Sequence, residues 1–346
     1  MRATELLEIT NSELDLIIEN TSKKLYMSKA IIEKDFWVCM ALKYLFNEFK
    51  YKDFLAFKGG TSLSKVYKLI ERFSEDIDLA LNWELLGYGK NEPYIERSNS
   101  KQVKFNEKIN CDTKIFIREK FLPIINEDFK NILKDRNFRF YIDENDKQTI
   151  CFDYPKNTID NSIMQIIRLE IGTLAEPIPA SKRYINTYIE DAYPNLFNEK
   201  ISVVVVDSLR TFYEKITILH REANRINNNY PNRYSRHFYD VFKMINTNLR
   251  EESLKNLNLL KNVIDFKKKF YSCNWANYDD IMMGKLKLIP SSSAINIFAK
   301  DYEKMKSMLF GNKISFETII VEIKKYESQI NEQIRKMVKW RFMKML

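Results

Sequence analysis

The chain has 346 residues, 45% of them hydrophobic, which is enough for one large domain or two of ordinary size. Lys and Arg outnumber Asp and Glu by 56 to 47, an excess that suits a polyanionic partner such as nucleic acid or a nucleotide, and equally suits an ordinary lysine-rich surface. No segment approaches the ~18 apolar residues of a membrane span, the four cysteines form no Cys-x-x-Cys pair, and two histidines are too few for a histidine-rich metal site. Because MRATELLEI at the N-terminus has no apolar signal core, we expect a cytoplasmic protein without membrane contact.

Helical periodicity dominates the first fifty residues. Segments 12–25 and 28–49 repeat apolar residues near helical spacing and predict two helices. From residue 53 the pattern predicts, in order, a strand, a tight turn, a helix and a second strand, at 53–57, 59–60, 61–73 and 74–83.

The middle of the chain is richer in β pattern. Residues 82–110 are polar and are expected to form a loop. FRFYIDENDKQTICFDYP at 138–155 predicts a hairpin that turns at DEND, and further strands are expected at 162–174 and 201–207.

The order of these elements predicts an α+β fold. A mixed β-sheet flanked by helices is expected in residues 1–200. Helical patterns then continue almost without interruption, so residues 201–346 are expected to form a mainly helical domain that contributes to an active-site cleft.

The diglycine stands where a backbone can approach an anion. Glycines between a strand and a helix let the chain come close to a phosphate, and the helix N-terminus offers free N–H groups and a partial positive charge. Thr61 and Ser62 follow directly and are expected to cap the helix and to donate hydroxyl hydrogen bonds. The alternative is a turn in which Gly59 and Gly60 only reverse the chain. A P-loop is excluded, because the chain has no GxxxxGK[ST] string.

Asp76 and Asp78 lie two positions apart in the second expected strand, so their carboxylates point to one face while Ile77 and Leu79 point to the other. Two carboxylates at this spacing suit Mg²⁺, which is often held by a few carboxylates together with substrate phosphates. The turn and the carboxylates together predict a metal-dependent site for a nucleoside triphosphate. The alternative is that both aspartates face solvent without a ligand.

These residues carry a resemblance to a known group of proteins. Gly-Gly-Thr/Ser, a helix and Asp-x-Asp on the next strand resemble the signature of the nucleotidyltransferase β-like superfamily. KGGTSLSKVYKLIERFSEDIDLAL at 58–81, with IIEKDFWV at 31–38, is more narrowly similar to the AbiEii/AbiGii toxin family. The similarity extends through RLEIGTLAEP, FYEKITILHREANR and RHFYD and covers about residues 28–245.

The resemblance implies that the turn holds the triphosphate, and we expect the nucleotide site to consist of Lys58, Gly59, Gly60, Thr61, Ser62, Lys65, Arg72 and Ser74. It also implies that Asp76 and Asp78 bind Mg²⁺ or Mn²⁺. Glu170 takes the place of a third acidic residue, which binds metal or acts as a base on the acceptor hydroxyl. Lys215 and Asp240 match a lysine and an aspartate of the family's helical half. The chain departs from the family pattern at Glu170 and at His237.

The same residues also permit ordinary roles. Lys215 lies at the edge of an apolar helix stripe, so its amine either reaches into a cleft or belongs to a common snorkelling lysine. Asp240 follows Arg236 by one helical turn, and an Arg236–Asp240 pair on a solvated face would be worth only ~0.3–0.5 kcal/mol. Glu170 lies among apolar neighbours, where a carboxylate is costly unless it is paired, for example with Arg168, and this favours a functional site.

We therefore expect a metal-dependent nucleotidyltransferase, a toxin of a toxin–antitoxin or abortive-infection system, that transfers NMP from NTP to an acceptor and releases pyrophosphate. The resemblance implies the 3′ end of tRNA as the acceptor and makes an antitoxin a possible protein partner. One alternative is a small-molecule nucleotidyltransferase of the antibiotic-modifying kind, which needs no extended basic surface. The other is an RNA-binding module without catalysis, against which the intact Asp76 and Asp78 pair argues.

Contacts to RNA are expected from the helical half. Tyr230 and Tyr234 are expected to be exposed and are compatible with stacking on bases. The lysine run 267–269 and the basic C-terminus with Trp340 and Phe342 are the stretches expected to contact phosphates. The alternative for each stretch is a solvated or packed helix face.

Overall fold

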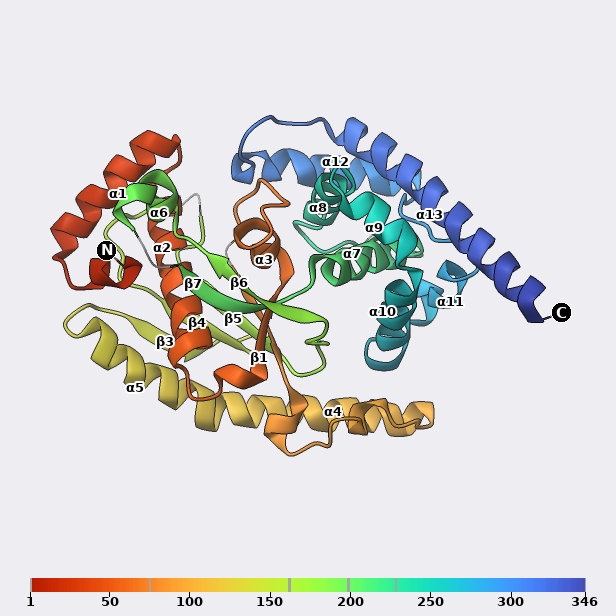
Figure 1. Ribbon diagram of the computed structural model, residues 1–346, viewed down its shortest axis with the longest axis horizontal. Helices are drawn as coiled ribbons and strands as arrows, with labels where there is room; N and C mark the ends of the chain where they lie inside the picture. The colour runs from red at the N-terminus through yellow and green to blue at the C-terminus, as the bar shows by residue number, and fades with distance from the viewer. Residues whose placement is uncertain (1, 75, 161–162, 198–199, 228, 346) are drawn as a thin grey trace. The chain divides into compact units, whose positions relative to one another are not determined.

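The computed structural model describes residues 2–74, 76–160, 163–197, 200–227 and 229–345, and the side chains of all of these except residues 307 and 340–345. The chain divides into two compact units (Figure 1). The first unit contains Met1–Val66 and Ser74–Val206, and the second contains Tyr67–Phe73 and Asp207–Leu346. The chain therefore passes between the units three times.

Two helices begin the first unit, as the sequence predicts. α1 (Asn11–Leu25) starts with a capping box, in which the Thr10 hydroxyl accepts from the backbone N–H of Glu13 and the Glu13 carboxylate accepts from the N–H of Thr10. α2 (Lys29–Lys43) is buried along nearly its whole length and continues into a π-helical turn, η2 (Tyr44–Glu48). The apolar residues of α2 therefore cover the core of the unit.

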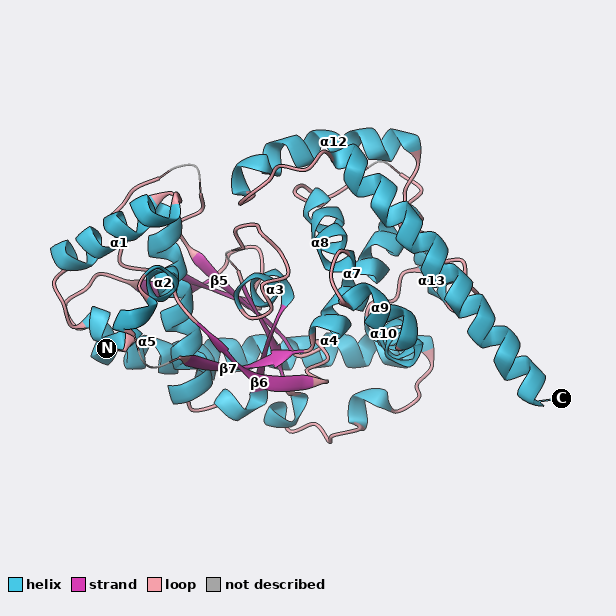
Figure 2. Cartoon of the chain, turned by 45° about the horizontal axis from the view of Figure 1, so that its top comes forward, coloured by secondary structure: helices cyan, strands magenta, loops and turns pink. Residues whose placement is uncertain are grey.

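A seven-stranded mixed sheet forms the centre of this unit, in the order β3-β4-β5-β2-β1-β7-β6 (Figures 1 and 2). Its strands are β1 (Leu55–Lys58), β2 (Ile77–Leu81), β3 (Arg139–Ile142), β4 (Thr149–Asp153), β5 (Ile167–Gly172), β6 (Ala180–Ile185) and β7 (Ile201–Val206). β2 pairs with β5 and β1 with β7 in parallel, and the other neighbours are antiparallel. β3 and β4 form the hairpin that was predicted around DEND.

Helices flank the sheet. They are α3 (Gly59–Lys65), α4 (Asn99–Phe116), α5 (Leu122–Leu133) and α6 (Tyr188–Ala192), with the short turns η1 (Ala3–Leu7), η3 (Lys52–Phe54), η4 (Trp83–Leu86), η5 (Glu92–Tyr94), η6 (Ile117–Phe121) and η7 (Pro194–Leu196). The prediction of a loop over 82–110 is wrong, because this stretch contains two of these turns and the first part of α4. The amino-acid pattern did not predict this helix, because α4 buries only Gln102, Ile109, Thr113 and Phe116 and most of its other residues are polar.

The two faces of the sheet differ in what lies on them. Side chains alternate between faces along each strand, and paired residues share a face, so Phe57 and Phe152 point to the same side. This side is apolar and packs against α2 and α5, since the Phe152 ring lies 6.3 Å from that of Trp37 and 5.3 Å from that of Phe129. The opposite face carries the polar residues described below.

The helix predicted over 61–73 ends at Lys65. The next segment, Tyr67–Phe73, belongs to the second unit. Its backbone is held there by partners from the far end of the chain, for example by Phe310 N, which donates to Glu71 O at 2.8 Å. Such tertiary hydrogen bonds replace the helical ones, although the local apolar spacing favours a helix.

The second unit is helical. Its elements are α7 (Ser208–Ala223), α8 (Ser235–Ile245), α9 (Leu249–Lys255), α10 (Leu257–Phe270), α11 (Tyr278–Ile281), α12 (Ser292–Met305) and α13 (Phe316–Met345), with η8 (Asn274–Ala276) and η9 (Lys306–Met308). α8 packs against α7, α12 and α13, as the strongly apolar face of α8 requires. In the described part of the chain, no helix has both the length and the apolar character needed to cross a bilayer. All four cysteines are free of disulfide bonds.

Candidate active site

The turn between β1 and α3 is shaped by contact with a carboxylate. Gly59 has a φ of +78°, in the left-handed region that favours glycine. A Cβ atom on Gly59 would lie 1.8 Å from Oδ2 and 2.4 Å from Cγ of Asp78. Only glycine therefore lets the Asp78 carboxylate lie directly against the backbone of the turn. The sequence predicts a close approach of this backbone to a bound anion, and the structure shows a close approach to Asp78.

Thr61 and Ser62 do not cap α3, because the helix already begins at Gly59. The Thr61 hydroxyl donates to the backbone carbonyl of Asp76 at 2.5 Å and lies 2.9 Å from Ser74 Oγ. The Ser62 hydroxyl donates to the Gly59 carbonyl at 2.9 Å. Both side chains are fully buried. The capping prediction is therefore wrong. The Thr61 hydroxyl ties α3 to the chain that carries the two aspartates, and the Ser62 hydroxyl bonds within α3.

A row of polar residues crosses four adjacent strands on one face of the sheet. The strand register pairs Lys58 with Asp78, Asp78 with Glu170, and Glu170 with Thr149. Because paired residues point to the same side, these side chains line up on the face opposite to α2 and α5. Asp76 stands at the entrance to β2, two positions before Asp78. Lys58, both aspartates and Glu170 are partly exposed, so a ligand has access to this row.

Glu170 pairs with Arg168, the partner that the sequence offered as the alternative to a functional site. Arg168 Nε lies 3.4 Å from Glu170 Oε1, and Arg168 Nη1 lies 2.6 Å from Asp143 Oδ2. The hydrogen bond from Arg168, aided by the backbone N–H of Asp146, lowers the pKa of Asp143 to about 2. The Glu170 side chain keeps 41% of its surface exposed and stays accessible. Asp143 was not predicted from the sequence, although it is the first residue of the DEND turn, directly after β3.

The carboxylates on this face fit a divalent cation that prefers oxygen. Asp76, Asp78 and Glu170 supply only oxygen donors, the chemistry that Mg²⁺ and Mn²⁺ favour. Among the described residues, no three His, Cys, Asp or Glu side chains are placed to hold a metal ion by themselves. A cation bound here therefore needs further oxygen ligands. The phosphates of a nucleotide are such ligands, so the residues fit a metal that binds together with its substrate.

Lys65 is a buried partner of Asp35 in this structure. Its Nζ lies 2.6 Å from Asp35 Oδ1 and 4.2 Å from the centre of the Tyr188 ring, and both charged side chains are only 4% exposed. Asp35 Oδ2 also accepts from the backbone N–H of Tyr188 at 2.7 Å. Burial disfavours the ammonium, but the Asp35 carboxylate outweighs this effect and raises the pKa of Lys65. The amine is thus directed at α2 and α6, whereas the sequence suggested a contact with phosphate.

The IIEKDFWV stretch holds two further buried charges to which the sequence analysis gave no role. The Glu33 carboxylate accepts from the backbone N–H of Asn157 at 2.7 Å and of Thr158 at 3.3 Å, and burial raises its pKa. Lys34 is fully buried and donates to the backbone carbonyl of Met164. These side chains fix the chain before β5, so this part of the motif supports the sheet.

In the second unit, Asp240 on α8 is the shared acceptor of two buried cations. Lys215 Nζ on α7 lies 2.7 Å from Asp240 Oδ2. Arg72 is bidentate, with Nε 2.7 Å from Oδ1 and Nη2 2.8 Å from Oδ2. Burial alone would raise the pKa of Asp240, but Arg72 and Lys215 hold it well below its ordinary value. Burial, together with the nearby Arg72, lowers the pKa of Lys215.

These contacts exclude the ordinary roles considered for the helical half. An Arg236–Asp240 pair on a solvated face is wrong, because Asp240 is fully buried and its partners come from elsewhere in the chain. Lys215 is not a snorkelling lysine, since only 8% of its side chain is exposed. His237 is buried, and its Nδ1 has no hydrogen-bond partner among the described residues. Burial and the nearby cations Lys215 and Arg236 hold the pKa of His237 well below its ordinary value.

The tyrosines proposed for base stacking are not exposed. The Tyr230 ring packs 4.6 Å from that of Phe298. The Tyr234 hydroxyl accepts a hydrogen bond from Arg221 Nη2 at 2.7 Å. Both rings are half-buried, so the prediction of exposed aromatic residues is wrong for this pair.

The lysine run 267–269 forms the last turn of α10. Lys268 is exposed and pairs with Asp279 at 2.5 Å, while the neighbouring Phe270 is buried. The run is thus accessible, although its aromatic neighbour is packed. The Trp340 and Phe342 side chains lie outside the described ones.

The mixed sheet, the β1–α3 turn and the carboxylates beside it define an α+β protein of the nucleotidyltransferase class. Residues 41–322 match the family model described as "Nucleotidyl transferase AbiEii toxin, Type IV TA system". This match covers well over half of the chain, so the chain belongs to that family of nucleotidyltransferase toxins.

Among solved structures, the chain is similar to MenT4, a nucleotidyltransferase toxin of Mycobacterium tuberculosis H37Rv, with 13% identity and a TM-score of 0.40 over 92% of this chain and 97% of that chain. A search of curated proteins finds no match to this sequence.

Proposed function

We propose that this toxin transfers a nucleoside monophosphate from an NTP to RNA, and that the triphosphate binds with Mg²⁺ or Mn²⁺ on the sheet face that carries Asp76 and Asp78. The observation that carries the proposal is the contact of the Asp78 carboxylate with the backbone of Gly59. The Asp78 carboxylate is suited to bind a cation, and the turn beside it is suited to bind a phosphate. A phosphate with its metal ion would therefore contact both groups.

The reaction assigns a role to each residue of this face. The acceptor hydroxyl oxygen forms a bond to the α-phosphorus, the bond from that phosphorus to the bridging oxygen breaks, and pyrophosphate leaves. Glu170, which is accessible, takes the hydroxyl proton. Lys58 is the cross-strand neighbour of Asp78 and attracts the phosphates. A bound divalent metal supplies Lewis-acid stabilisation of the charge on the leaving pyrophosphate.

Buried polar contacts support these roles. Thr61 and Ser74 hold the chain at Asp76, and Lys65 anchors α3 through Asp35 rather than by touching phosphate. In the second unit we assign Lys215 and Arg72 to negative charge on the substrates and Asp240 to positioning them. The support for this assignment is that two cations share a single carboxylate, so these three groups together carry a net positive charge.

The proposed acceptor is the 3′ end of tRNA, and the proposed protein partner is an antitoxin. The acceptor rests on the family resemblance and on the basic excess of the chain, since counterion release favours RNA on a positive surface. The antitoxin rests on the type of system in the family description.

To test this, the protein is incubated with each α-labelled NTP and total tRNA, in the presence of Mg²⁺, Mn²⁺ or EDTA. Labelled RNA and released pyrophosphate are both measured. We expect label on RNA for at least one NTP and none in EDTA. Label on small acceptors in place of RNA would instead support the antibiotic-modifying type. RNA binding without NTP consumption would contradict an enzymatic function.

Asp76→Asn and Asp78→Asn test the metal ligands within this assay. Each change keeps the side-chain shape and removes a charge, so we expect a loss of transfer of roughly 10²-fold or more with little effect on folding. Asp153→Asn is the matched control, since Asp153 is an aspartate on β4 that pairs with Lys156 away from the turn. Activity within tenfold of wild type for both Asp76→Asn and Asp78→Asn at saturating metal would overturn the assignment.

A further inference from the structure

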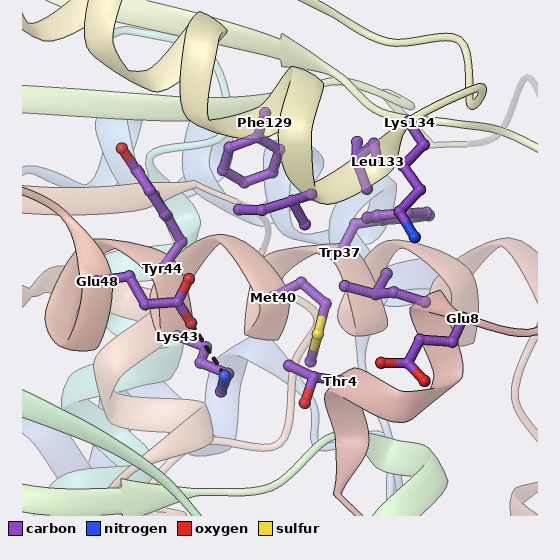
Figure 3. A pocket seen from close by; sticks show the side chains of 12 residues that line it. Thr4, Glu8, Trp37, Met40, Lys43, Tyr44, Glu48, Phe129, Leu133 and Lys134 are labelled. Carbon is purple, nitrogen blue, oxygen red and sulfur yellow. Dashed lines mark hydrogen bonds and ion pairs between the residues drawn. The ribbon is translucent and has the colours of Figure 1, made fainter.

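Two features of the first unit are accessible and lie outside the candidate active site. One is a half-open cavity of about 280 Å³ between η1, α2 with η2, and α5 (Figure 3). Two lysines and two glutamates line it, and Lys43 pairs with Glu48 at 3.0 Å, so the cavity selects neither sign of charge. The other is the outer edge of β6, the strand that ends the sheet beside β7 (Figure 2).

The outer edge of β6 is unpaired. β6 forms a ladder with β7, from Ala180 opposite Val206 to Ile185 opposite Ile201, and has no strand on its other side. Apart from this ladder, no hydrogen bond from any described residue reaches the backbone of 180–185. The N–H and C=O groups on the outer side of β6 are therefore available to a second strand.

Side chains do not cover this edge either. Five of the six residues of β6 are exposed, and Tyr184 has an exposed fraction of 57%. β3, at the other end of the sheet, differs, because its Phe140 is buried against Phe129 of α5, with ring centres 4.9 Å apart. β3 is thus packed under a helix, whereas β6 is open.

Lys182 and Arg183 set the charge of the edge. Successive strand residues point to opposite faces, so Lys182 shares its face with Tyr184 and Val204, and Arg183 lies on the other face. Neither cation has an ion-pair partner in the part of the chain that the structure describes. The sequence has no acidic residue from 177 to 189. A strand laid along β6 therefore meets positive charge on both of its faces.

These features distinguish between the possible occupants of the edge. A second copy of β6 would bring the cations of two strands together, and like charges across a strand pair are unfavourable. A nucleic acid would neutralise the cations, but phosphate oxygens only accept hydrogen bonds and leave the strand carbonyls unpaired. A peptide strand offers donors and acceptors in alternation, and acidic side chains on it would pair with Lys182 and Arg183.

We propose that the outer edge of β6 binds an extended acidic segment of a partner protein, which adds an eighth strand to the sheet. The backbone of this segment pairs with 180–185, two consecutive acidic residues lie beside Lys182 and Arg183, and an apolar side chain packs on Tyr184. The contact is independent of nucleotidyl transfer, because β6 carries no residue of the candidate active site.

Three labelled peptides of one length test this with the full-length protein. The acidic peptide alternates threonine and valine around two adjacent central glutamates, and the second peptide has lysines in place of the glutamates. The third is the acidic peptide N-methylated at both glutamates, which keeps the charge and removes one N–H from each edge of the peptide. Fluorescence anisotropy measures affinity, and the ¹⁵N amide signals of the protein locate the contact. We expect saturable binding of the acidic peptide with shifts in 180–185, and binding at least about tenfold weaker for the other two.

Two double variants test the role of charge. Lys182→Glu with Arg183→Glu should make the lysine peptide the tighter ligand. Lys101→Glu with Lys104→Glu is the matched control, because these lysines are exposed on α4, and it should keep the preference for the acidic peptide.

The wild-type protein decides the matter even where a variant folds poorly. Absence of saturable binding of the acidic peptide overturns the proposal, as do equal binding of the N-methylated peptide and shifts confined to residues outside β6. A short oligouridylate that shifts the β6 signals when the acidic peptide does not would assign the edge to RNA. A dimer of the protein that forms with the same shifts would assign it to a second copy.

Discussion

Gly59 meets two structural demands at once. Its φ is positive, and the Asp78 carboxylate occupies the position of a side chain. Gly87 meets only the first demand, because its φ is +87° and nothing lies within 4 Å of the position of a Cβ atom. The two glycines therefore separate the cost of backbone strain from the cost of displacing Asp78.

Gly59→Ala should lower the rate of transfer at least about 100-fold, because the new methyl group pushes Asp78, the proposed metal ligand, away from the turn. Gly87→Ala should cost ~1–2 kcal/mol of stability from the positive φ alone and keep activity within about twofold. Initial rates and urea unfolding measure the two effects. Equal loss of activity in both variants would show that the contact with Asp78 has no role in the reaction.

Asp240 predicts a pH dependence of stability in the second unit. Its pKa is lower in the folded chain than the ~3.9 of an unfolded chain, because Arg72 and Lys215 favour the carboxylate. The sign follows: the stabilisation is fully present above the unfolded pKa and is lost as the pH falls from about 4 towards the folded pKa. Near neutral pH the contribution is therefore complete.

Asp240→Asn should lower the free energy of unfolding by ~3–5 kcal/mol at pH 7, because two buried cations lose their counter-charge. The gap to wild type should narrow as the pH falls below about 4. Urea unfolding followed by circular dichroism from pH 3 to pH 7 measures this. Asp265→Asn is the control, since the Lys261–Asp265 pair is half exposed and should contribute less than ~1 kcal/mol. A gap that does not change with pH would contradict the assignment.

At the scale of elements, α3 is held by helices that precede and follow it in the sequence. The Lys65–Asp35 pair joins α3 to α2, and the backbone of Tyr188 joins Asp35 to α6. The buried Lys65–Asp35 pair therefore helps to fix the position of the turn that contacts Asp78. Loss of either partner leaves an uncompensated charge in the interior.

Lys65→Met and Asp35→Asn should each cost ~3–5 kcal/mol, and the double variant should cost much less than their sum. Both single variants should raise the KM for NTP alike, because both loosen α3. Urea unfolding and steady-state rates measure these effects, with Lys23→Met in the exposed Lys23–Glu19 pair of α1 as control. A KM effect confined to Lys65→Met would assign Lys65 to the phosphates.

At the scale of the whole molecule, the basic excess predicts binding that weakens with salt. Replacing the lysine run 267–269 by alanine should lower RNA affinity and reduce the slope of log affinity against log salt by up to ~2–3, at ~0.7–0.9 for each phosphate that the variant no longer neutralises. NTP binding should not change. Lys268 must break its ion pair with Asp279 to reach a phosphate, so it should contribute less than its neighbours to the change in slope.

The control for this experiment removes the same charge elsewhere. Lys101, Lys104 and Lys108 are exposed on α4 of the first unit, and their joint replacement by alanine should leave the slope near that of wild type. Equal slopes for the two triple variants would show that net charge, and not the end of α10, sets the salt dependence.

Local pattern was sufficient for the parts of the fold that depend on neighbours in sequence. Segments 12–25 and 28–49 predicted α1 and α2, and FRFYIDENDKQTICFDYP predicted the β3–β4 hairpin. The strand, diglycine and second strand with Asp76 and Asp78 were found in the predicted order. Helices, strands and turns are readable from periodicity and turn residues, because each depends on residues only a few positions apart in the sequence.

Tertiary structure alone decided which charges meet in the pairs Arg72–Asp240 and Lys65–Asp35. Arg72 and Asp240 are 168 positions apart, and Lys65 and Asp35 are 30 positions apart, yet each pair is buried. Helical spacing offered Arg236 as an alternative partner of Asp240 and predicted a helix up to residue 73, and the structure shows neither. The physical reason is that spacing shows which side chains share a face, whereas the partner of a buried charge is set by the desolvation cost of leaving it alone, which only the packed chain determines.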